Sequence, residues 1–117
     1  MTRIQCMTTY KKWDIVLVPF PFTNLFTTKK RPALIISPDD YNKGDDVIIL
    51  FITSKIKTAK REGDYHIKNW RDAGLPKPSM TRMKFATIEK SLIIKRIGSI
   101  KAADRQNLTN ELHSFFN

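Results

Sequence analysis

The chain has few of the residues that build disulfide frameworks and metal sites. Its 117 residues include one cysteine, Cys6, and two histidines, His66 and His113. One cysteine cannot form a disulfide within the chain, which suits a reducing compartment. Two histidines and one cysteine at unrelated positions give no metal-ligand spacing. We therefore expect no bound metal, no cofactor and a metal-independent mechanism.

Long hydrophobic runs and glycine-rich loops are also absent from the sequence. No apolar run approaches the roughly 20 residues of a membrane span, and the first residues lack the hydrophobic segment of a signal peptide. The four glycines are scattered one at a time, so no phosphate-binding loop is formed and nucleotide triphosphates are not expected as substrates. We expect a cytoplasmic protein with no membrane contact.

What the chain does have is an excess of positive charge. Lys and Arg number 21 against 11 Asp and Glu, a formal net charge of +10. Such an excess favours polyanionic partners, although an ordinary basic surface gives the same composition. The length fits one domain, which we place at residues 13–117 after an N-terminal tail at 1–12.

Short runs of Val, Ile, Leu and Phe between turn residues predict about five strands, mostly antiparallel. They are Asp14 to Phe20, Arg31 to Ser37, Asp46 to Thr53, Ser79 to Phe85 and Ser91 to Gly98. The first strand is apolar on both faces, which requires cover by a barrel interior and by a helix or a partner chain. Helical spacing of Leu108, Leu112 and Phe115 predicts a helix at about Ala102 to Phe116, and Ile67 to Ala73 could add one helical turn ending at Gly74.

Polar residues at two strand ends are the candidates for chemistry. Arg31 begins the second strand after a long loop, Pro21 to Lys30, and Thr53 and Ser54 end the third. A guanidinium beside hydroxyls suits a phosphodiester, because arginine offers a fixed fork of donors. Each also has an ordinary interpretation, as a surface charge or as a hydroxyl that caps a turn.

The two histidines are the other candidates for catalysis, as an acid and base pair for RNA cleavage. His66 lies in an expected short strand and His113 on the polar edge of the last helix, so each has a surface explanation. Neither falls near the strand ends that carry Arg31 and Thr53.

Several short motifs occur in an order that resembles the MazF/PemK toxin family, over about Trp13 to Phe116. They are Asp14 to Val18, Lys30 to Ser37, Ile52 to Ser54, Ala73 to Ser79, Thr87 to Ile94 and Ile97 to Gly98. The resemblance implies a mainly β fold, an SH3-like β-barrel of five to seven strands with a C-terminal helix. It also implies a homodimer and an endoribonuclease that cleaves single-stranded RNA at short sequences and is neutralised by a cognate antitoxin.

Carried onto this sequence, the resemblance places the catalytic residues at Arg31 and Thr53 and implies attack by the 2′-hydroxyl of the RNA. The products would be a 2′,3′-cyclic phosphate and a 5′-hydroxyl. Arginine is an implausible general base because it stays protonated, so Arg31 is cast as an electrostatic stabiliser and the base is left unassigned. The residues expected to contact RNA or assist are Lys29, Lys30, Ser54, Lys55, Arg82 and Phe22.

Three departures from the family pattern stand out. Trp13 occupies the position before the first-strand aspartate, where the family usually has glycine. The segment Ser79 to Thr87 is about one residue short of the family spacing, with Lys84 near a position that is often acidic. These departures put the role of Arg82 and the RNA sequence preference in doubt.

Two other functions fit the same sequence. One is a protein-targeting toxin that resembles the CcdB gyrase poisons, which need no phosphodiester site. The other is a non-catalytic RNA-binding barrel, in which Phe20 to Arg31 would stack on bases and contact phosphates. Arg31 and Thr53 favour the nuclease over the gyrase poison, and only an activity assay excludes the binding module.

Overall fold

The computed structural model describes residues 9–21 and 29–117. Its elements are β1 (Asp14–Pro19), β2 (Lys30–Ile35), the short 3-10 helix η1 (Tyr41–Lys43), β3 (Asp46–Thr53), β4 (Tyr65–His66), β5 (Met80–Glu89), the 3-10 helix η2 (Lys90–Leu92), β6 (Lys95–Ser99) and α1 (Ala102–Phe116). The predicted fold class, mainly β with a C-terminal helix, is confirmed. No described helix is long and apolar enough to cross a membrane.

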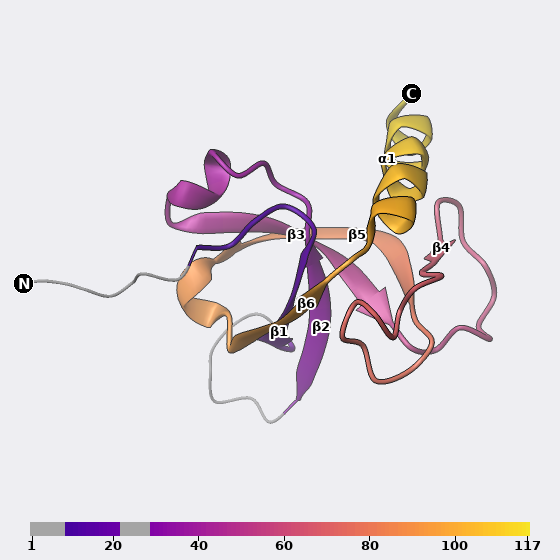
Figure 1. Ribbon diagram of the computed structural model, residues 1–117, viewed down its shortest axis with the longest axis horizontal. Helices are drawn as coiled ribbons and strands as arrows, with labels where there is room; N and C mark the ends of the chain where they lie inside the picture. The colour runs from indigo at the N-terminus through magenta and orange to yellow at the C-terminus, as the bar shows by residue number, and fades with distance from the viewer. Residues whose placement is uncertain (1–8, 22–28) are drawn as a thin grey trace, which may run out of the picture.

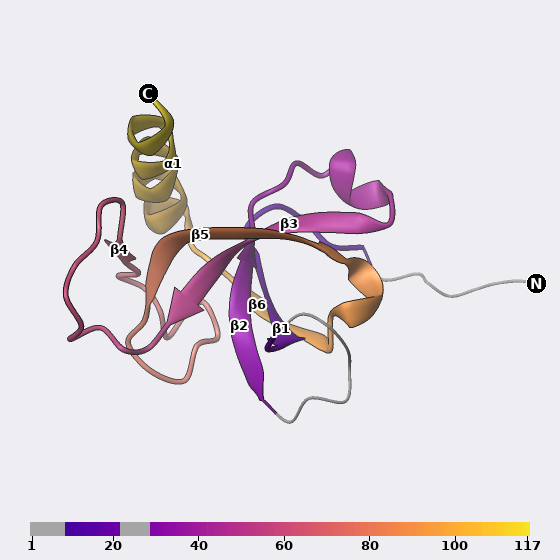
Figure 2. The ribbon, with the colours of Figure 1, turned by 180° about the vertical axis from the view of Figure 1, so that it is seen from behind.

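The six strands form one antiparallel sheet in the order β4-β5-β3-β2-β1-β6. Figure 1 shows the sheet curled into a half-barrel, with α1 standing beside β4 at one end. Seen from behind, the long β5 bends across the sheet (Figure 2). This bend coincides with a shift in the β3–β5 register between Leu50 and Phe51. A bulge of this kind bends a strand and increases its twist.

The apolar side chains form two clusters, one on each face of the sheet. Ile15 of β1 is fully buried in the cluster that α1 covers through Leu108. Val16 and Val18 of the same strand are fully buried in the other cluster, on the opposite face of the sheet. The predicted need for cover on both faces of the first strand is thus met within one chain. Each fully buried side chain of this size contributes about 1.5–3 kcal/mol to the free energy of unfolding.

The predicted strand boundaries differ from the structure most in two segments. The segment predicted as a strand at Ser91 to Gly98 begins instead with η2, and β6 starts only at Lys95. The amide of Ile93 donates to the Lys90 carbonyl, which closes a turn, and the Ile94 amide then donates to Leu17 of β1. β5 runs to Glu89, beyond the predicted end at Phe85.

Where one helical turn was predicted at Ile67 to Ala73, residues 68–74 form hydrogen-bonded turns without a regular helix, and these end at Gly74. The Ala73 amide donates to the Asn69 carbonyl, and the Leu75 amide donates to Trp70 across Gly74, whose φ is +94°. This is the usual helix-ending arrangement with glycine in the left-handed region. The turn directs residues 75–79 back toward the sheet, where they meet the ends of β2 and β3.

Candidate active site

A cavity of about 410 Å³ opens where the ends of β2 and β3 meet the segment that follows Gly74. Two predicted catalytic residues, Arg31 and Thr53, line it together. The complete lining is Val18, Phe20, Arg31, Pro32, Ala33, Phe51, Ile52, Thr53, Ser54, Lys55, Leu75, Pro76, Lys77, Ser79, Arg82 and Lys84. The cavity therefore continues the inner face of the curled sheet beyond its buried core.

Arg31 and Thr53 occupy matching positions on neighbouring strands. The β2–β3 register pairs Ala33 with Phe51, and each catalytic candidate lies two residues further toward the cavity on its own strand. Because side chains alternate between faces with a period of two, all four point to the same side of the sheet. Pairing between the strands ends at Ala33 and Phe51, so the guanidinium and the hydroxyl lie where the strands part.

The guanidinium of Arg31 lies over an aromatic ring and is exposed to solvent. Its Cζ is 5.8 Å from the centroid of Phe20, within the range of a cation–π contact. Phe20 is reached diagonally across the β1–β2 pair, since the residue paired with Arg31 is Val18. Within the described part of the chain, Arg31 forms no ion pair. Its charge is thus available to an anion in the cavity.

Thr53 caps a turn and also lines the cavity. Its Oγ1 accepts a hydrogen bond from the Lys55 amide at 3.1 Å, which caps the turn after β3. The same hydroxyl lines the cavity, and its proton can still be donated to a ligand. Ser54 and Lys55 follow it along the rim. The capping bond fixes the Thr53 side chain opposite Arg31.

Arg82 lines the cavity but is held by a carboxylate. Its Nη2 is 2.8 Å from Oδ2 of Asp64, and the Asp64 side chain is fully buried. The hydrogen bonds from Arg82 hold the pKa of Asp64 below its ordinary value, although burial acts in the opposite direction. Nη2 also donates to the carbonyl of Ala59 at 3.3 Å. Arg82 thereby fastens the charged loop after Lys55 to β5, and its contact with RNA stays a prediction.

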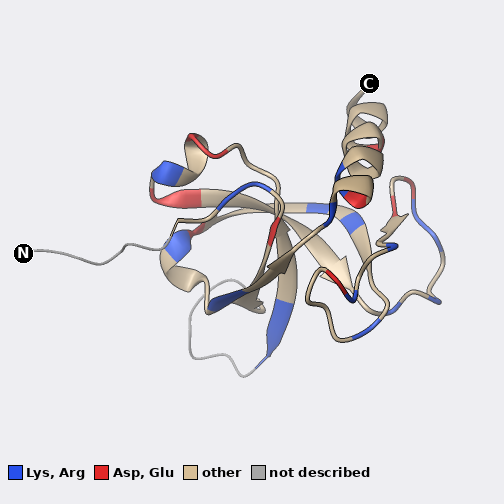
Figure 3. Ribbon diagram, viewed as in Figure 1, with Lys and Arg blue, Asp and Glu red and all other residues tan. Residues whose placement is uncertain are grey.

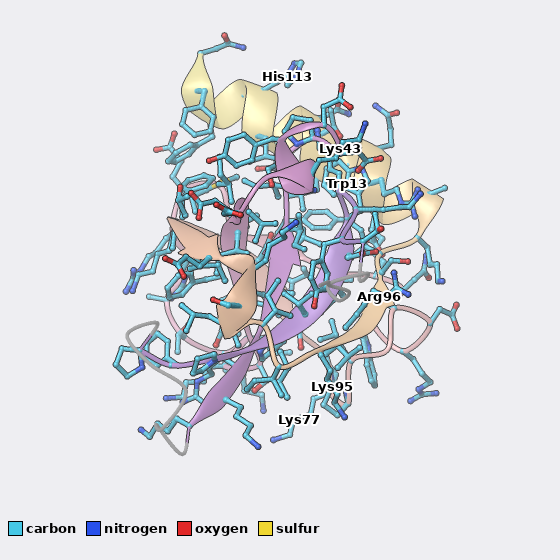
Figure 4. The ribbon with its side chains drawn as sticks, turned by 90° about the vertical axis from the view of Figure 1, so that its left-hand side faces the viewer. Trp13, Lys43, Lys77, Lys95, Arg96 and His113 are labelled. Atoms are coloured by element: carbon cyan, nitrogen blue, oxygen red, sulfur yellow. The ribbon has the colours of Figure 1, made fainter. Side chains whose placement is uncertain are left out.

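The other predicted residues that the structure describes lie outside the cavity lining. Lys29 and Lys30 are exposed at the start of β2, and Phe22 lies outside the described residues. Neither His66 nor His113 lines the cavity. In Figure 4, His113 lies at one end of the molecule and Lys77, which does line the cavity, at the other. The placement agrees with the surface interpretation of both histidines.

Several cavity residues were missed by the sequence reasoning, and three of them are suited to contact a ligand. Phe51 appeared as an ordinary strand residue, Lys77 as part of a motif, and Lys84 only as a departure from a family pattern. The period-two alternation that places Thr53 on the cavity face also places Phe51 there. No comparable signal exists for Lys84, because the bulge in β5 interrupts the alternation.

The electrostatics of the cavity are of one sign. Arg31, Lys55, Lys77, Arg82 and Lys84 line it, and its described lining contains no Asp, Glu or His. Residues 1–8 and 22–28 contain none of these three types either. Figure 3 shows basic segments at the start of β2 and in the bent part of β5. The arrangement can stabilise an anion strongly, but it offers no carboxylate or imidazole as a general base.

Comparison with known proteins points to one family. The sequence profile of the PemK-like, MazF-like toxins of type II toxin-antitoxin systems matches residues 11–116. No curated protein sequence matches the chain significantly.

Solved structures share the fold at low sequence identity. An endoribonuclease in complex with its cognate antitoxin, from a mycobacterial species, has a TM-score of 0.72 at 14% identity, covering 92% of this chain and 93% of that one. The Mycobacterium tuberculosis toxin MazF-mt6 has a TM-score of 0.69 at 19% identity, covering 88% of this chain and 95% of that one. A MazE-MazF structure from Deinococcus radiodurans has a TM-score of 0.71 at 15% identity, covering 94% of this chain and 97% of that one.

Proposed function

Because the chain belongs to the PemK-like, MazF-like family of type II toxins, we propose that it is an endoribonuclease that cleaves single-stranded RNA at a short sequence. One observation carries the proposal. Arg31 and Thr53 face a single cavity from strand ends that part at that point, and the described residues that line the cavity include five basic side chains and no acidic one. A phosphodiester would be held there by donors on two sides.

The reaction needs no nucleophile from the protein. The 2′-oxygen of the RNA attacks the adjacent phosphorus, the bond from phosphorus to the 5′-oxygen breaks, and the products are a 2′,3′-cyclic phosphate and a 5′-hydroxyl. The proton lost from the 2′-hydroxyl goes to solvent, and the leaving 5′-oxygen gains one. The protein has to align the two oxygens about the phosphorus and stabilise charge on the phosphoryl oxygens.

Arg31 and Thr53 have distinct parts in this reaction. The Arg31 guanidinium presents several donors in a plane and stabilises the growing charge on the phosphoryl oxygens. It is also the candidate donor of a proton to the leaving 5′-oxygen, and it then regains a proton from water. The Thr53 hydroxyl donates to a second phosphoryl oxygen. Since every catalytic contact is a donor to an anion, we propose that the reaction is metal-independent.

The partners follow from family membership. A toxin of a type II system is neutralised by an antitoxin protein, and one of the similar structures is an endoribonuclease with its cognate antitoxin. We propose an antitoxin partner, a homodimer and a place in the cytoplasm, where RNA is available. The buried faces of β1 no longer argue for a dimer, because α1 and the curled sheet cover them. Light scattering at micromolar concentration should return twice the 13.6 kDa monomer mass.

Two rival functions make different predictions about the cavity. A gyrase poison of the same fold has no use for a guanidinium opposite a hydroxyl in a basic cavity. A non-catalytic RNA-binding barrel would use the basic residues but would leave RNA intact. The proposed nuclease is the function that uses both the positive charge of the cavity and the placement of Arg31 opposite Thr53.

The test is cleavage of a long RNA by the purified protein in the presence of EDTA, with both new ends mapped. We expect cuts at one short sequence, leaving cyclic phosphate and 5′-hydroxyl ends. An oligonucleotide with a single 2′-deoxyribose at the mapped site should resist cleavage, because it lacks the nucleophile. Normal cutting of that substrate, or intact RNA after prolonged incubation, would refute the proposal.

A further inference from the structure

The floor of the cavity is a pair of aromatic rings, and each ring has a cation above it. Phe20 and Phe51 meet edge to face, with centroids 6.0 Å apart and planes at 84°. Arg31 lies over the first ring, and Nζ of Lys84 lies 5.7 Å from the centroid of the second. The two cations thus occupy equivalent positions on adjoining rings.

Lys84 reaches this position because of the bulge in β5. The register pairs Leu50 with Phe85 and then Phe51 with Arg82, so Met83 and Lys84 are inserted between paired positions. Met83 packs against the cluster that α1 covers, whereas Lys84 lines the cavity. Bulges beside functional sites commonly redirect a side chain in this way.

The charge of Lys84 has no counterpart within the described residues. It forms no ion pair there, in contrast to Arg82, which is bound to Asp64. No carboxylate lines the described cavity. A cation held over a ring at the wall of such a cavity is suited to an anionic ligand.

We propose that Lys84, seated on Phe51, is a substrate-binding residue that contacts an RNA phosphate other than the scissile one. This inference rests on the proposed endoribonuclease function and extends it. Arg31 acts on the reacting phosphate, while Lys84 holds a phosphate elsewhere along the strand and sets how the RNA lies in the cavity. Its contact is the same before and during reaction, so it contributes to binding and not to the chemical step.

The first test measures binding without cleavage, on the intact protein. A fluorescein-labelled 2′-O-methyl RNA oligomer lacks the nucleophile and stays uncut. For Lys84→Met, which keeps a flexible apolar chain on the ring, the slope of log affinity against log salt should fall by about 0.7, the value for one phosphate of a single strand. Affinity at low salt should fall about tenfold, the effect of one charge-assisted hydrogen bond.

Two further variants make the comparison specific. Lys84→Arg keeps the charge over the ring and should retain the wild-type slope. Lys43→Met removes one charge from η1, which Figure 4 shows at the end of the molecule away from Lys77, and should change neither slope nor affinity. If Lys84→Met behaves like Lys43→Met, the inference is wrong.

The second test uses cleavable RNA. Lys84→Met should raise KM about tenfold and leave kcat within about twofold of the wild type, the pattern of lost uniform binding. A fall in kcat with KM unchanged would overturn the inference. A wild-type protein that binds the oligomer with a Lys84-dependent slope but never cuts RNA would refute the nuclease function and uphold the binding role of Lys84.

Discussion

Arg82 donates hydrogen bonds to both carboxylate oxygens of Asp64, from Nε to Oδ1 at 3.1 Å and from Nη2 to Oδ2 at 2.8 Å. The Asp64 carboxylate also accepts from the Arg61 amide at 2.8 Å. These bonds close the charged loop between β3 and β4 against β5, beside the cavity. The loop is therefore held by one buried acid, and its anchoring should depend on the charge of that acid.

Asp64→Asn should weaken the fold most at neutral pH and least in acid. Bonding to Arg82 lowers the pKa of Asp64, so the stabilisation is present above the unfolded pKa of about 3.9 and is lost as the pH falls through the folded value. Denaturant unfolding of both proteins between about pH 7 and about pH 2 would show their free energies converging in acid. A gap that is constant over this range would contradict the assignment.

Tyr65→Phe should make the free energy of unfolding fall less steeply as the pH rises into the alkaline range. Burial, together with the hydrogen bond to Asp104, raises the pKa of Tyr65 to about 12. A raised folded pKa means that the stabilisation is complete below the unfolded value of about 10 and is lost as the pH rises toward the folded value. The free energy of unfolding of the wild type should fall more steeply than that of Tyr65→Phe between these values. Parallel curves would show that Tyr65 does not couple to folding.

Thr81→Val should be neutral or should raise the free energy of unfolding by about 1 kcal/mol. Thr81 is fully buried on β5, and its Oγ1 has no hydrogen-bond partner among the described residues. Valine has nearly the same shape and removes an unpaired polar group. Thr87→Val, at an exposed position of the same strand, is the control. Destabilisation by more than about 1 kcal/mol relative to that control would reveal a bond to the hydroxyl.

Local patterns predicted most of the fold, and long-range pairs account for the rest. The helix at Ala102–Phe116 follows from the spacing of its apolar residues, and it begins and ends as predicted. β4 has only two residues, too few to show an alternating pattern, although the sequence did suggest a short strand around His66. Asp104 gave no signal either, although its carboxylate accepts the amides of Lys68 and Asn69 and fixes the turn that leads to the cavity. Partners separated by about 35 residues in the chain cannot be read from local spacing.

Trp13 shows what a sequence departure can and cannot indicate. In the sequence, Trp13 stands where the related family usually has glycine. The structure explains why glycine suits this position, because the φ of Trp13 is +80°, in the left-handed region that favours glycine. Its amide donates to Ile35 and its carbonyl accepts from Ile100, which fixes the backbone in this strained region. The sequence showed that the residue at this position is unusual, whereas the backbone strain is seen only in the three-dimensional structure. The same holds for the candidate site: residue types and the family resemblance pointed to Arg31 and Thr53, whereas the position of Lys84 in the cavity lining depends on the bulge in β5.

The rate of cleavage should rise with pH and reach no plateau between about pH 5 and about pH 9. The described cavity offers no carboxylate or imidazole that could titrate in this range as a base, and arginine stays protonated throughout. The 2′-hydroxyl then loses its proton to solvent. Single-turnover rates across this range provide the measurement. If the cleavage rate instead levels off above neutral pH, and this levelling is absent in His66→Ala, the general base would be that histidine.

Arg31→Ala and Thr53→Ala should each lower kcat by a factor of about 10² to 10³, the usual cost of losing one preorganised donor to a developing oxyanion. Arg31→Lys should recover only part of the activity, because an ammonium lacks the planar fork of donors, whereas Thr53→Ser should recover most of it, because the hydroxyl remains. Both histidines lie outside the cavity lining, so His66→Ala and His113→Ala should cleave RNA at the wild-type rate. Circular dichroism on every variant separates loss of activity from loss of fold, which matters for Thr53 because its Oγ1 also caps the turn at Lys55. Inactive histidine variants beside an active Arg31→Ala would place the chemistry elsewhere on the molecule.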